Sequence, residues 1–182
     1  MKTLKWFVIR HALAVDRRLW VGRSDAKRPL TKEGVQQFKK LLKKYHFAFK
    51  NKKVCLVTSD FERAIETAHL LAKWVKVVET CQTKLLRPNA SPQKFVRWLA
   101  AQDKLINPRF ILIIVGHEPQ LSKLLGLLLT GHGQSFIQLK KGAIAELMFQ
   151  PKGQLGRILG QKDFEGSFRL RSLVFPKHRS GN

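Results

Sequence analysis

The chain has 182 residues, 44% hydrophobic and 26% charged, which is enough for one globular domain with its own core. Its charge is unbalanced, because 35 lysines and arginines stand against 12 acidic residues and give a formal net charge of +23. Such a field attracts nucleic acids, acidic membranes, acidic proteins or phosphorylated substrates without selecting among them. The basic residues are spread along the chain with few aromatic residues between them, so no nucleic-acid-binding motif stands out.

Two cysteines form neither a disulfide framework nor a cysteine metal site, and reduced thiols are expected. The first apolar run covers only residues 6–9, well short of the roughly 7–15 residues of an export signal. No window reaches the roughly 18–20 apolar residues needed to span a membrane. We therefore expect a cytoplasmic protein that does not contact membranes. The sequence also shows no set of residues with the spacing of metal ligands.

The first predicted element is a buried strand over residues 6–9, because four consecutive apolar residues suit the interior of a parallel sheet. The strand places Arg10 and His11 at its carboxyl end, where open α/β sheets bind their ligands. A guanidinium binds phosphoryl oxygens, and a neutral imidazole beside it could attack the phosphorus. Taken alone, the pair is better explained as the plain end of a strand, and the rest of the chain has to change that interpretation.

A polar, arginine-rich connection over residues 13–29 follows, and it is longer than most loops in compact domains. Thr31 is the predicted cap of an amphipathic helix. A second buried strand is predicted over residues 54–58, and Ser59-Asp60 is the predicted cap of the next helix. Arg63 lies in the first turn of that helix, where the dipole disfavours a cation, so we expect it to be held there for an anion.

Two more strand–helix units are predicted in the middle of the chain. Residues 75–78 indicate a third strand, and the serine–proline pair at 91–92 is a strong helix start. The run over residues 110–115 is the most convincing buried strand. It delivers His117 and Glu118 to its carboxyl end, and a helix follows.

The final third of the chain loses this alternation. Strands over residues 143–149 and 168–174, the first followed by a turn at 151–154, are predicted to extend the sheet antiparallel at one edge. The tail over residues 177–182 is expected to be disordered. The sequence therefore predicts a single α/β domain, residues 1–176, with a mostly parallel sheet and an antiparallel edge.

Three separate strand ends or helix starts each offer a reactive or phosphate-binding group, and convergence at one sheet edge would form one crevice. The motifs around them resemble those of the histidine phosphatase (phosphoglycerate-mutase-like) superfamily over about residues 4–176. The matching motifs are Arg10-His11-Ala12, Arg28-Pro29-Leu30-Thr31 with Gly34, Thr58-Ser59 with Arg63-Ala64 and Thr67-Ala68, and Val115-Gly116-His117-Glu118-Pro119. The short length, Ala12 in place of glycine and residues 141–145 look most like the SixA branch, the phosphohistidine phosphatases.

The resemblance implies a three-layer α/β/α domain of the phosphoglycerate-mutase type and a two-step phosphoryl transfer that needs no metal or other cofactor. His11 would be the nucleophile, forming a phosphohistidine intermediate that water later hydrolyses. Arg10, Arg63 and His117 would bind the equatorial oxygens, and His117 would do so best when protonated. Alanine at position 12 fits this pattern where the backbone has an ordinary φ.

Two roles stay open. Glu118 is either a proton donor to the leaving group, or an activator of water, or simply a carboxylate favoured by the dipole at a helix start. Arg17 and Arg28, in the 13–29 loop, are candidate substrate contacts at the rim of the site. The expected partner is a phosphorylated substrate, with a histidine-phosphorylated signalling protein favoured, and the net charge also allows other polyanions.

Other functions remain as alternatives. One is a small-molecule phosphomonoesterase of the same fold. Another is a basic anion-binding module without catalysis, against which the presence of every core motif residue except the glycine argues. A mutase is disfavoured, because no acidic partner stands in the expected place.

Overall fold

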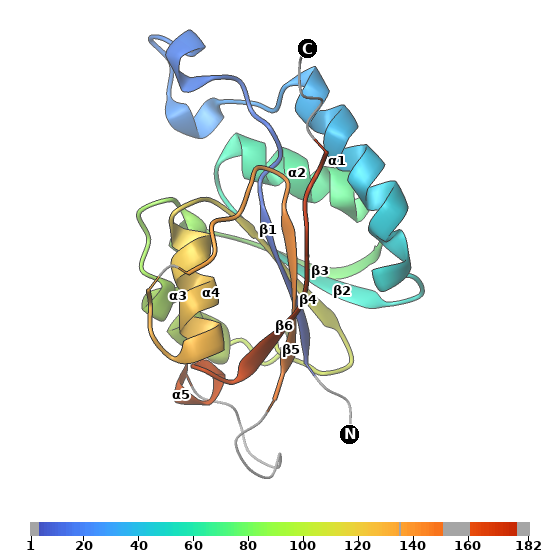
Figure 1. The fold of residues 1–182 in the computed structure, drawn as a ribbon, viewed down its shortest axis with the longest axis vertical. Helices are drawn as coiled ribbons and strands as arrows, with labels where there is room; N and C mark the ends of the chain where they lie inside the picture. The colour runs from blue at the N-terminus through green and yellow to red at the C-terminus, as the bar shows by residue number, and fades with distance from the viewer. Residues whose placement is uncertain (1–3, 135, 151–160, 178–182) are drawn as a thin grey trace.

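The computed structural model describes residues 4–134, 136–150 and 161–177. The predicted turn at residues 151–154, and all but the first residue of the predicted 177–182 tail, lie outside these ranges. The described residues form a six-stranded sheet with the order β3-β2-β4-β1-β5-β6 (Figure 1). The strands are β1 (Lys5–Arg10), β2 (Lys53–Ser59), β3 (Lys76–Thr83), β4 (Ile111–Gly116), β5 (Ile144–Phe149) and β6 (Phe168–Val174).

The sheet is mostly parallel with an antiparallel edge, as predicted. Strand β4 pairs in parallel with both β1 and β2, and β2 pairs in parallel with β3. Strand β5 runs antiparallel to β1, and β6 runs antiparallel to β5. Only residues 75–78 were predicted for β3, which continues to Thr83. Its polar second half lies on an exposed sheet edge, where no apolar run is needed.

Helices cover both faces of the sheet, so the domain has the three-layer α/β/α architecture that the resemblance implies (Figure 1). Side chains of α1 and α2 belong to the core on one face, and those of α3, α4 and α5 belong to the core on the other. The helices are α1 (Lys32–Tyr45), α2 (Glu62–Ala72), α3 (Pro92–Ala100), α4 (Gln120–Thr130) and the short α5 (Gln161–Phe164). The sequence analysis did not predict α5, whose four residues are too few for a helical period.

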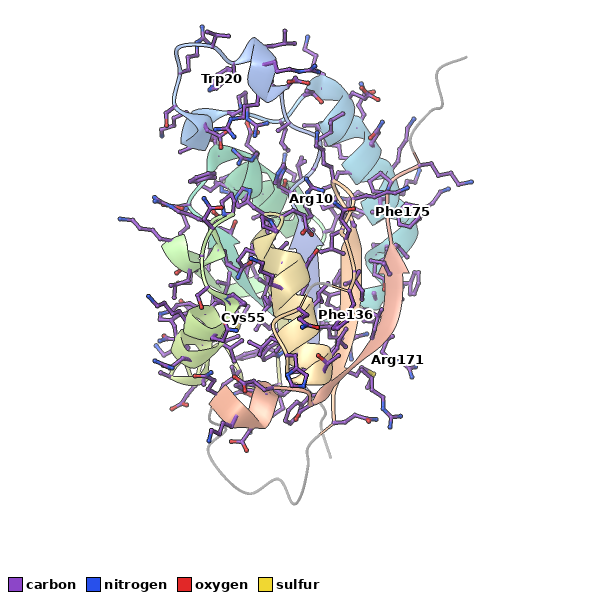
Figure 2. All side chains as sticks on the ribbon, turned by 60° about the vertical axis from the view of Figure 1, so that its left-hand side comes forward. Arg10, Trp20, Cys55, Phe136, Arg171 and Phe175 are labelled. Atoms are coloured by element: carbon purple, nitrogen blue, oxygen red, sulfur yellow. The ribbon has the colours of Figure 1, made fainter. Side chains whose placement is uncertain are left out.

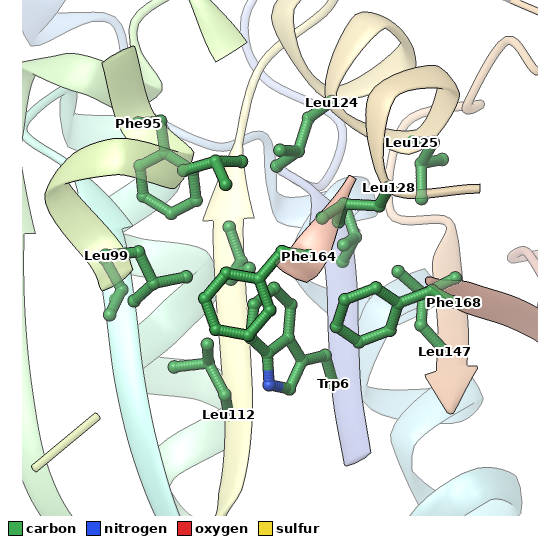
Figure 3. Close-up of a cluster of buried hydrophobic side chains, with 14 of the residues drawn as sticks. Trp6, Phe95, Leu99, Leu112, Leu124, Leu125, Leu128, Leu147, Phe164 and Phe168 are labelled. Carbon is green, nitrogen blue, oxygen red and sulfur yellow. The ribbon is translucent and has the colours of Figure 1, made fainter. Parts of the chain in front are cut away.

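Aromatic side chains close the core beneath α3 and α4 (Figure 3). Trp6 of β1 lies with its ring centroid 5.1 Å from that of Phe164 and 4.5 Å from that of Phe168. Trp6 is distant in the chain from the two phenylalanines, and each of the three residues is at most 4% exposed. Burying large aromatic rings contributes much of the stability of such a core, so β1 is fixed at the centre of the sheet. None of the described helices is both long and apolar enough to cross a membrane.

Two of the three predicted helix caps are confirmed. The Thr31 hydroxyl accepts a hydrogen bond from the Gly34 amide at 2.9 Å, and Ser91 caps α3 in the same way. The predicted Ser59-Asp60 cap of α2 is wrong, because α2 begins one residue later and has no side-chain cap. The Asp60 carboxylate accepts from the Arg87 guanidinium instead, and an ionised donor competes well against a backbone amide.

The long 13–29 loop is closed at its base against the start of α1. The Val15 amide donates to the Pro29 carbonyl at 3.0 Å, and Ala14 pairs with Leu30 in an antiparallel bridge. Gly34 permits this closure, because a Cβ at that position would lie 2.1 Å from the carbonyl oxygen of Leu13. The loop therefore leaves the body of the molecule and returns to it at adjacent points, as the blue segment at one end of Figure 1 shows.

Candidate active site

The two histidines predicted at strand ends lie close together at the carboxyl ends of two central strands. Strands β1 and β4 are parallel neighbours, and Arg10 lies opposite Gly116 in their register. The His11 amide donates to the Gly116 carbonyl at 3.0 Å, and the imidazole centroids of His11 and His117 are 5.0 Å apart. The carboxyl ends of the central parallel strands therefore form the site, as expected for an open α/β sheet.

The hydrogen bonds of His11 define its reactive nitrogen. Its Nδ1 lies 2.7 Å from the Ala12 carbonyl oxygen, which can only accept, so Nδ1 carries the proton in the neutral ring. The lone pair is then on Nε2, which faces the Nε–H of Arg63 at 3.3 Å. Burial lowers the pKa of His11 well below its usual value, and the charges of its neighbours lower it further. His11 is consequently a neutral, oriented potential nucleophile.

Thr67 holds the chain immediately after His11. Its hydroxyl accepts from the Ala12 amide at 3.0 Å and donates to the Arg63 carbonyl at 2.6 Å. The turn that orients His11 is thereby tied to the first turns of α2. Asn51 is the only described residue other than glycine that has a positive φ. Ala12 therefore has an ordinary backbone conformation.

Arg63 is almost fully buried and is paired through all three of its nitrogens. Besides the Nε–H to His11, Nη1 donates to the Asp25 carbonyl at 2.8 Å and Nη2 to the Asp25 carboxylate at 3.1 Å. The guanidinium also lies over the ring of Phe61, 4.9 Å from its centroid. Arg63 thus joins the reactive histidine to the 13–29 loop.

Asp25 was not predicted from the sequence as a site residue. The residue lies 38 positions from Arg63, and only the folded loop brings them together. The available signal was its rarity, since it is one of 12 acidic residues in a strongly basic chain and stands among arginines. Phe61 was also missed, although its ring lies between the guanidinium groups of Arg63 and Arg87 and against His117.

Arg10 and Glu118 hold the same segment of chain from two sides. Arg10 Nη1 donates to the Leu139 carbonyl at 2.7 Å, while the Leu139 amide donates to Glu118 Oε1 at 3.2 Å. The second Glu118 oxygen accepts from the Ser122 hydroxyl at 2.5 Å. Arg10 is half-buried and lies below the loop that carries Trp20 (Figure 2). Both oxygens of Glu118 are engaged, which favours the anchoring role over that of an acid.

His117 is the least satisfied group of the site. Its ring is 1% exposed, and neither ring nitrogen has a hydrogen-bond partner among the described residues. Burial, followed by the charge of Arg63, lowers the pKa of His117 to about 3, and Arg10 and Arg28 act in the same direction. The ring is therefore neutral at neutral pH, and the protonated form expected from the sequence would need an added negative charge beside it.

The two predicted rim residues have different places. Arg28 is largely withdrawn from solvent, because its Nε donates to the Asp25 carboxylate at 2.9 Å and its Nη1 to the Val15 carbonyl at 2.7 Å. Arg28 therefore shapes the loop and positions Asp25. Arg17 is exposed, and its charge lies near enough to lower the pKa of Arg63. Arg17 is thus the better candidate for a rim contact.

The site contains buried polar groups that lack partners. Arg10 Nε and both ring nitrogens of His117 are buried without hydrogen-bond partners, as far as the described residues go. Neutral His117 offers one N–H donor, and an anion with several acceptor oxygens could accept from it and from Arg10 together. Among the same residues, no group of three or more histidine, cysteine or acidic side chains could hold a metal ion.

The low pKa of His117 makes the stability of the protein dependent on pH. Below about pH 6.5 His117 is protonated in the unfolded chain, whereas in the folded protein it stays neutral until about pH 3. The free energy of unfolding therefore falls as the pH falls from about 6.5 to about 3. From pH 7 to pH 5 we expect His117→Asn to lose about 2 kcal/mol less stability than the wild type, measured by urea unfolding. The variant His69→Asn, which removes an exposed histidine, should follow the wild-type curve. Parallel curves for wild type and His117→Asn would contradict the prediction.

Comparison with known proteins gives matches in sequence and in structure. The family model for the histidine phosphatase superfamily (branch 1) matches residues 6–87, which include His11 and Arg63. An uncharacterised protein of Picosynechococcus sp. is 28% identical over 147 residues, which are 79% of this chain and 84% of that protein.

Solved structures of phosphatases share the fold. The protein histidine phosphatase SixA, complexed with tungstate, superposes with a TM-score of 0.69 at 18% identity, covering 94% of this chain and 96% of that one. A mycobacterial glucosyl-3-phosphoglycerate phosphatase gives 0.64 at 14% identity, covering 93% and 97% of the two chains. A phosphoserine phosphatase mutant from Entamoeba histolytica, in complex with phosphoserine, gives 0.62 at 17%, covering 93% and 95%. This chain therefore has the phosphoglycerate-mutase-like fold, and its residues 6–87 are similar to the histidine phosphatase superfamily (branch 1).

Proposed function

We propose that the protein is a phosphatase of the SixA type, which hydrolyses protein phosphohistidine through a covalent intermediate on His11. The observation that carries the proposal is the arrangement of His11, whose protonated Nδ1 is fixed on the Ala12 carbonyl while Nε2 faces Arg63 and His117. A neutral imidazole with its lone pair fixed toward a set of buried donors is suited to attack an electrophile that carries negative charge. A phosphoryl group is such an electrophile.

The first chemical step forms a bond from His11 Nε2 to phosphorus and breaks the bond to the leaving group. The leaving nitrogen or oxygen departs with the bonding electrons and takes up a proton from water, which is returned to the solvent when the attacking water of the second step loses its proton. The contact between Arg63 Nε and His11 Nε2 must open for this attack, and at 3.3 Å it is long and therefore weak. The released Nε–H can then bind a phosphoryl oxygen, together with Arg10 and His117.

The second step returns the enzyme to its starting state. A water oxygen attacks the phosphorus of phosphohistidine, the bond to Nε2 breaks, and inorganic phosphate leaves. During both steps the negative charge of the phosphoryl group raises the pKa of His117, so that His117 can bind an oxygen as a donor in either protonation state. No step in this scheme requires a residue outside the described site.

The comparisons support a phosphoryl-group substrate more strongly than a particular leaving group. The SixA structure that resembles this chain holds tungstate, an oxyanion with the shape of phosphate. Relatives of equal fold act on sugar and amino-acid phosphates according to their names, so a small phosphomonoester is the alternative substrate. The engagement of both Glu118 oxygens favours phosphohistidine, since this leaving group needs less help from an acid than an alcohol does. The cytoplasmic location remains a prediction.

Replacing His11 by alanine tests the nucleophile. We expect His11→Ala to lower kcat on p-nitrophenyl phosphate and on free phosphohistidine by at least about 1000-fold, because the attacking atom is removed. Acid-quenched wild type should retain phosphate that is stable to base and labile to acid, as a phosphohistidine is, and the variant should retain none. Equal rates for the two proteins would overturn the enzyme proposal. Binding of polyanions without any hydrolysis would then favour the anion-binding module.

Asp25 is proposed as the residue that positions Arg63. Arg63 has five N–H donors, of which Asp25 engages two and His11 one, so a phosphoryl group can bind without displacing Asp25. We expect Asp25→Asn to lower kcat about 10-fold, the size of a lost charged hydrogen bond, without raising the inhibition constant of inorganic phosphate. Asp16→Asn, which loses only an exposed pair with Arg18 in the same loop, should be unaffected. An unchanged kcat in Asp25→Asn would show that Arg63 is held in position without the Asp25 carboxylate, and would contradict the prediction.

Glu118→Gln separates the two roles of Glu118. As an anchor, glutamine still accepts from the Leu139 amide, so turnover of phosphohistidine and of phosphoserine should fall equally and less than about 3-fold. As the acid, its loss should slow phosphoserine selectively, by about 100-fold or more, because the alcohol is the poorer leaving group. We expect the first result. Ser122→Ala is the matched control, because it removes a partner of the carboxylate and leaves the carboxylate in place.

A further inference from the structure

The tip of the 13–29 loop presents apolar side chains to solvent beside the site. This segment, residues Arg17–Arg23 and here called the loop tip, has the sequence Arg-Arg-Leu-Trp-Val-Gly-Arg. Leu19 and Val21 are each 80% exposed, more than any other large hydrophobic residue that the structure describes. The loop tip projects from the end of the molecule at which the catalytic strands finish (Figure 1), and Trp20 lies at that end in Figure 2.

The loop tip is ordered by its own contacts. The indole N–H of Trp20 donates to the Ser24 carbonyl at 3.0 Å, and the Arg23 guanidinium lies 4.7 Å from the centre of the Trp20 ring. At the other side, the Asp16 carboxylate accepts from both the backbone and the guanidinium of Arg18. Leu19 and Val21 are therefore held outward by a structured turn, and a partner would meet them without first having to order the loop.

The loop tip is also joined to the reaction centre. Asp25, which follows it in the same loop, binds Arg63 through both its carbonyl and its carboxylate. The charge of Arg17 acts on Arg63 as well. A molecule seated on Leu19 and Val21 therefore rests on the loop whose Asp25 binds Arg63, the residue that contacts His11.

The surroundings of the loop tip decide which kind of partner fits. Three arginines flank the apolar pair, and the one acidic side chain among them, Asp16, is already paired with Arg18. Charge complementarity therefore calls for a partner surface that is acidic around an apolar patch. A phosphorylated histidine on the same surface would add negative charge beside these arginines.

We propose that Leu19 and Val21 dock the macromolecular substrate, a histidine-phosphorylated protein whose surface around the histidine is acidic with an apolar patch. This inference rests on the proposed function and adds to it the surface that separates protein phosphohistidine from small phosphates. Docking affects how fast the enzyme and the protein substrate associate and how long their complex lasts. It does not change the chemical steps at His11. Loss of docking should therefore be visible only with the large substrate.

The test is the double substitution Leu19→Ser and Val21→Ser in the full chain. The probes are p-nitrophenyl phosphate and an acidic signalling domain phosphorylated on histidine with phosphoramidate. We expect kcat/KM for the phosphorylated domain to fall at least 10-fold, through KM, and kcat/KM for p-nitrophenyl phosphate to stay within 2-fold. The control is Phe47→Ser, since Phe47 is 67% exposed but follows α1 at the opposite end of the sheet. It should change neither value.

The remaining outcomes each decide against the docking surface. Equal losses on both probes would make the loop tip part of the catalytic structure, and no loss on the domain would leave it without a role in docking. Wild-type hydrolysis of p-nitrophenyl phosphate alone would overturn protein docking while the phosphatase stands, and hydrolysis of neither probe would overturn the proposed function itself. Binding to phosphatidylglycerol vesicles that the double variant loses, with hydrolysis of the domain unchanged, would assign the loop tip to a membrane instead.

Discussion

The arrangement of the site depends on one buried guanidinium. Arg63 is 3% exposed, and a charge withdrawn this far from water is stable only where it is paired and hydrogen-bonded. Asp25 supplies that pairing from the 13–29 loop, and the Nε–H of Arg63 is aligned on His11. The position of the loop and the orientation of the histidine therefore follow from the same requirement, and neither could change alone without leaving part of the guanidinium unpaired.

On the other side of His11, by contrast, buried polar groups lack partners. Arg10 Nε and the two nitrogens of His117 are buried without partners within the described part of the chain, and an unsatisfied buried donor costs about 1–3 kcal/mol. Burial is the main cause of the lowered pKa of both His117 and Arg63, and the cluster also carries more positive than negative charge, which lowers the pKa of His117 further. A tetrahedral or planar oxyanion would relieve both deficits in one event. The site therefore folds with some of its buried polar groups unpaired, and a bound oxyanion would pair them.

Much of this could be predicted from residue order alone, because strand ends and helix starts are local features. Arg10, His11 and His117 were expected at the carboxyl ends of buried strands, and the misfit of Arg63 with its helix dipole indicated an anion. Contacts that depend on the folded loop were not accessible. Asp25 reaches Arg63 only after the loop closes on α1, and the pKa of His117 depends first on its burial in the folded protein and then on charges from three separate segments.

The loop that pairs Arg63 is also the loop that carries the exposed tip, and this limits how the molecule can work. Since Asp25 engages only two of the five Arg63 donors, a phosphoryl group and Asp25 can bind the guanidinium together. The loop then has no reason to leave during turnover, and its base is fixed by the hydrogen bond between Val15 and Pro29. A rim that stays in place selects substrates by their fit to a preformed surface, and does not need to close over them. The same buried charge that contacts the proposed nucleophile, His11, thereby also fixes the loop that carries the proposed docking surface.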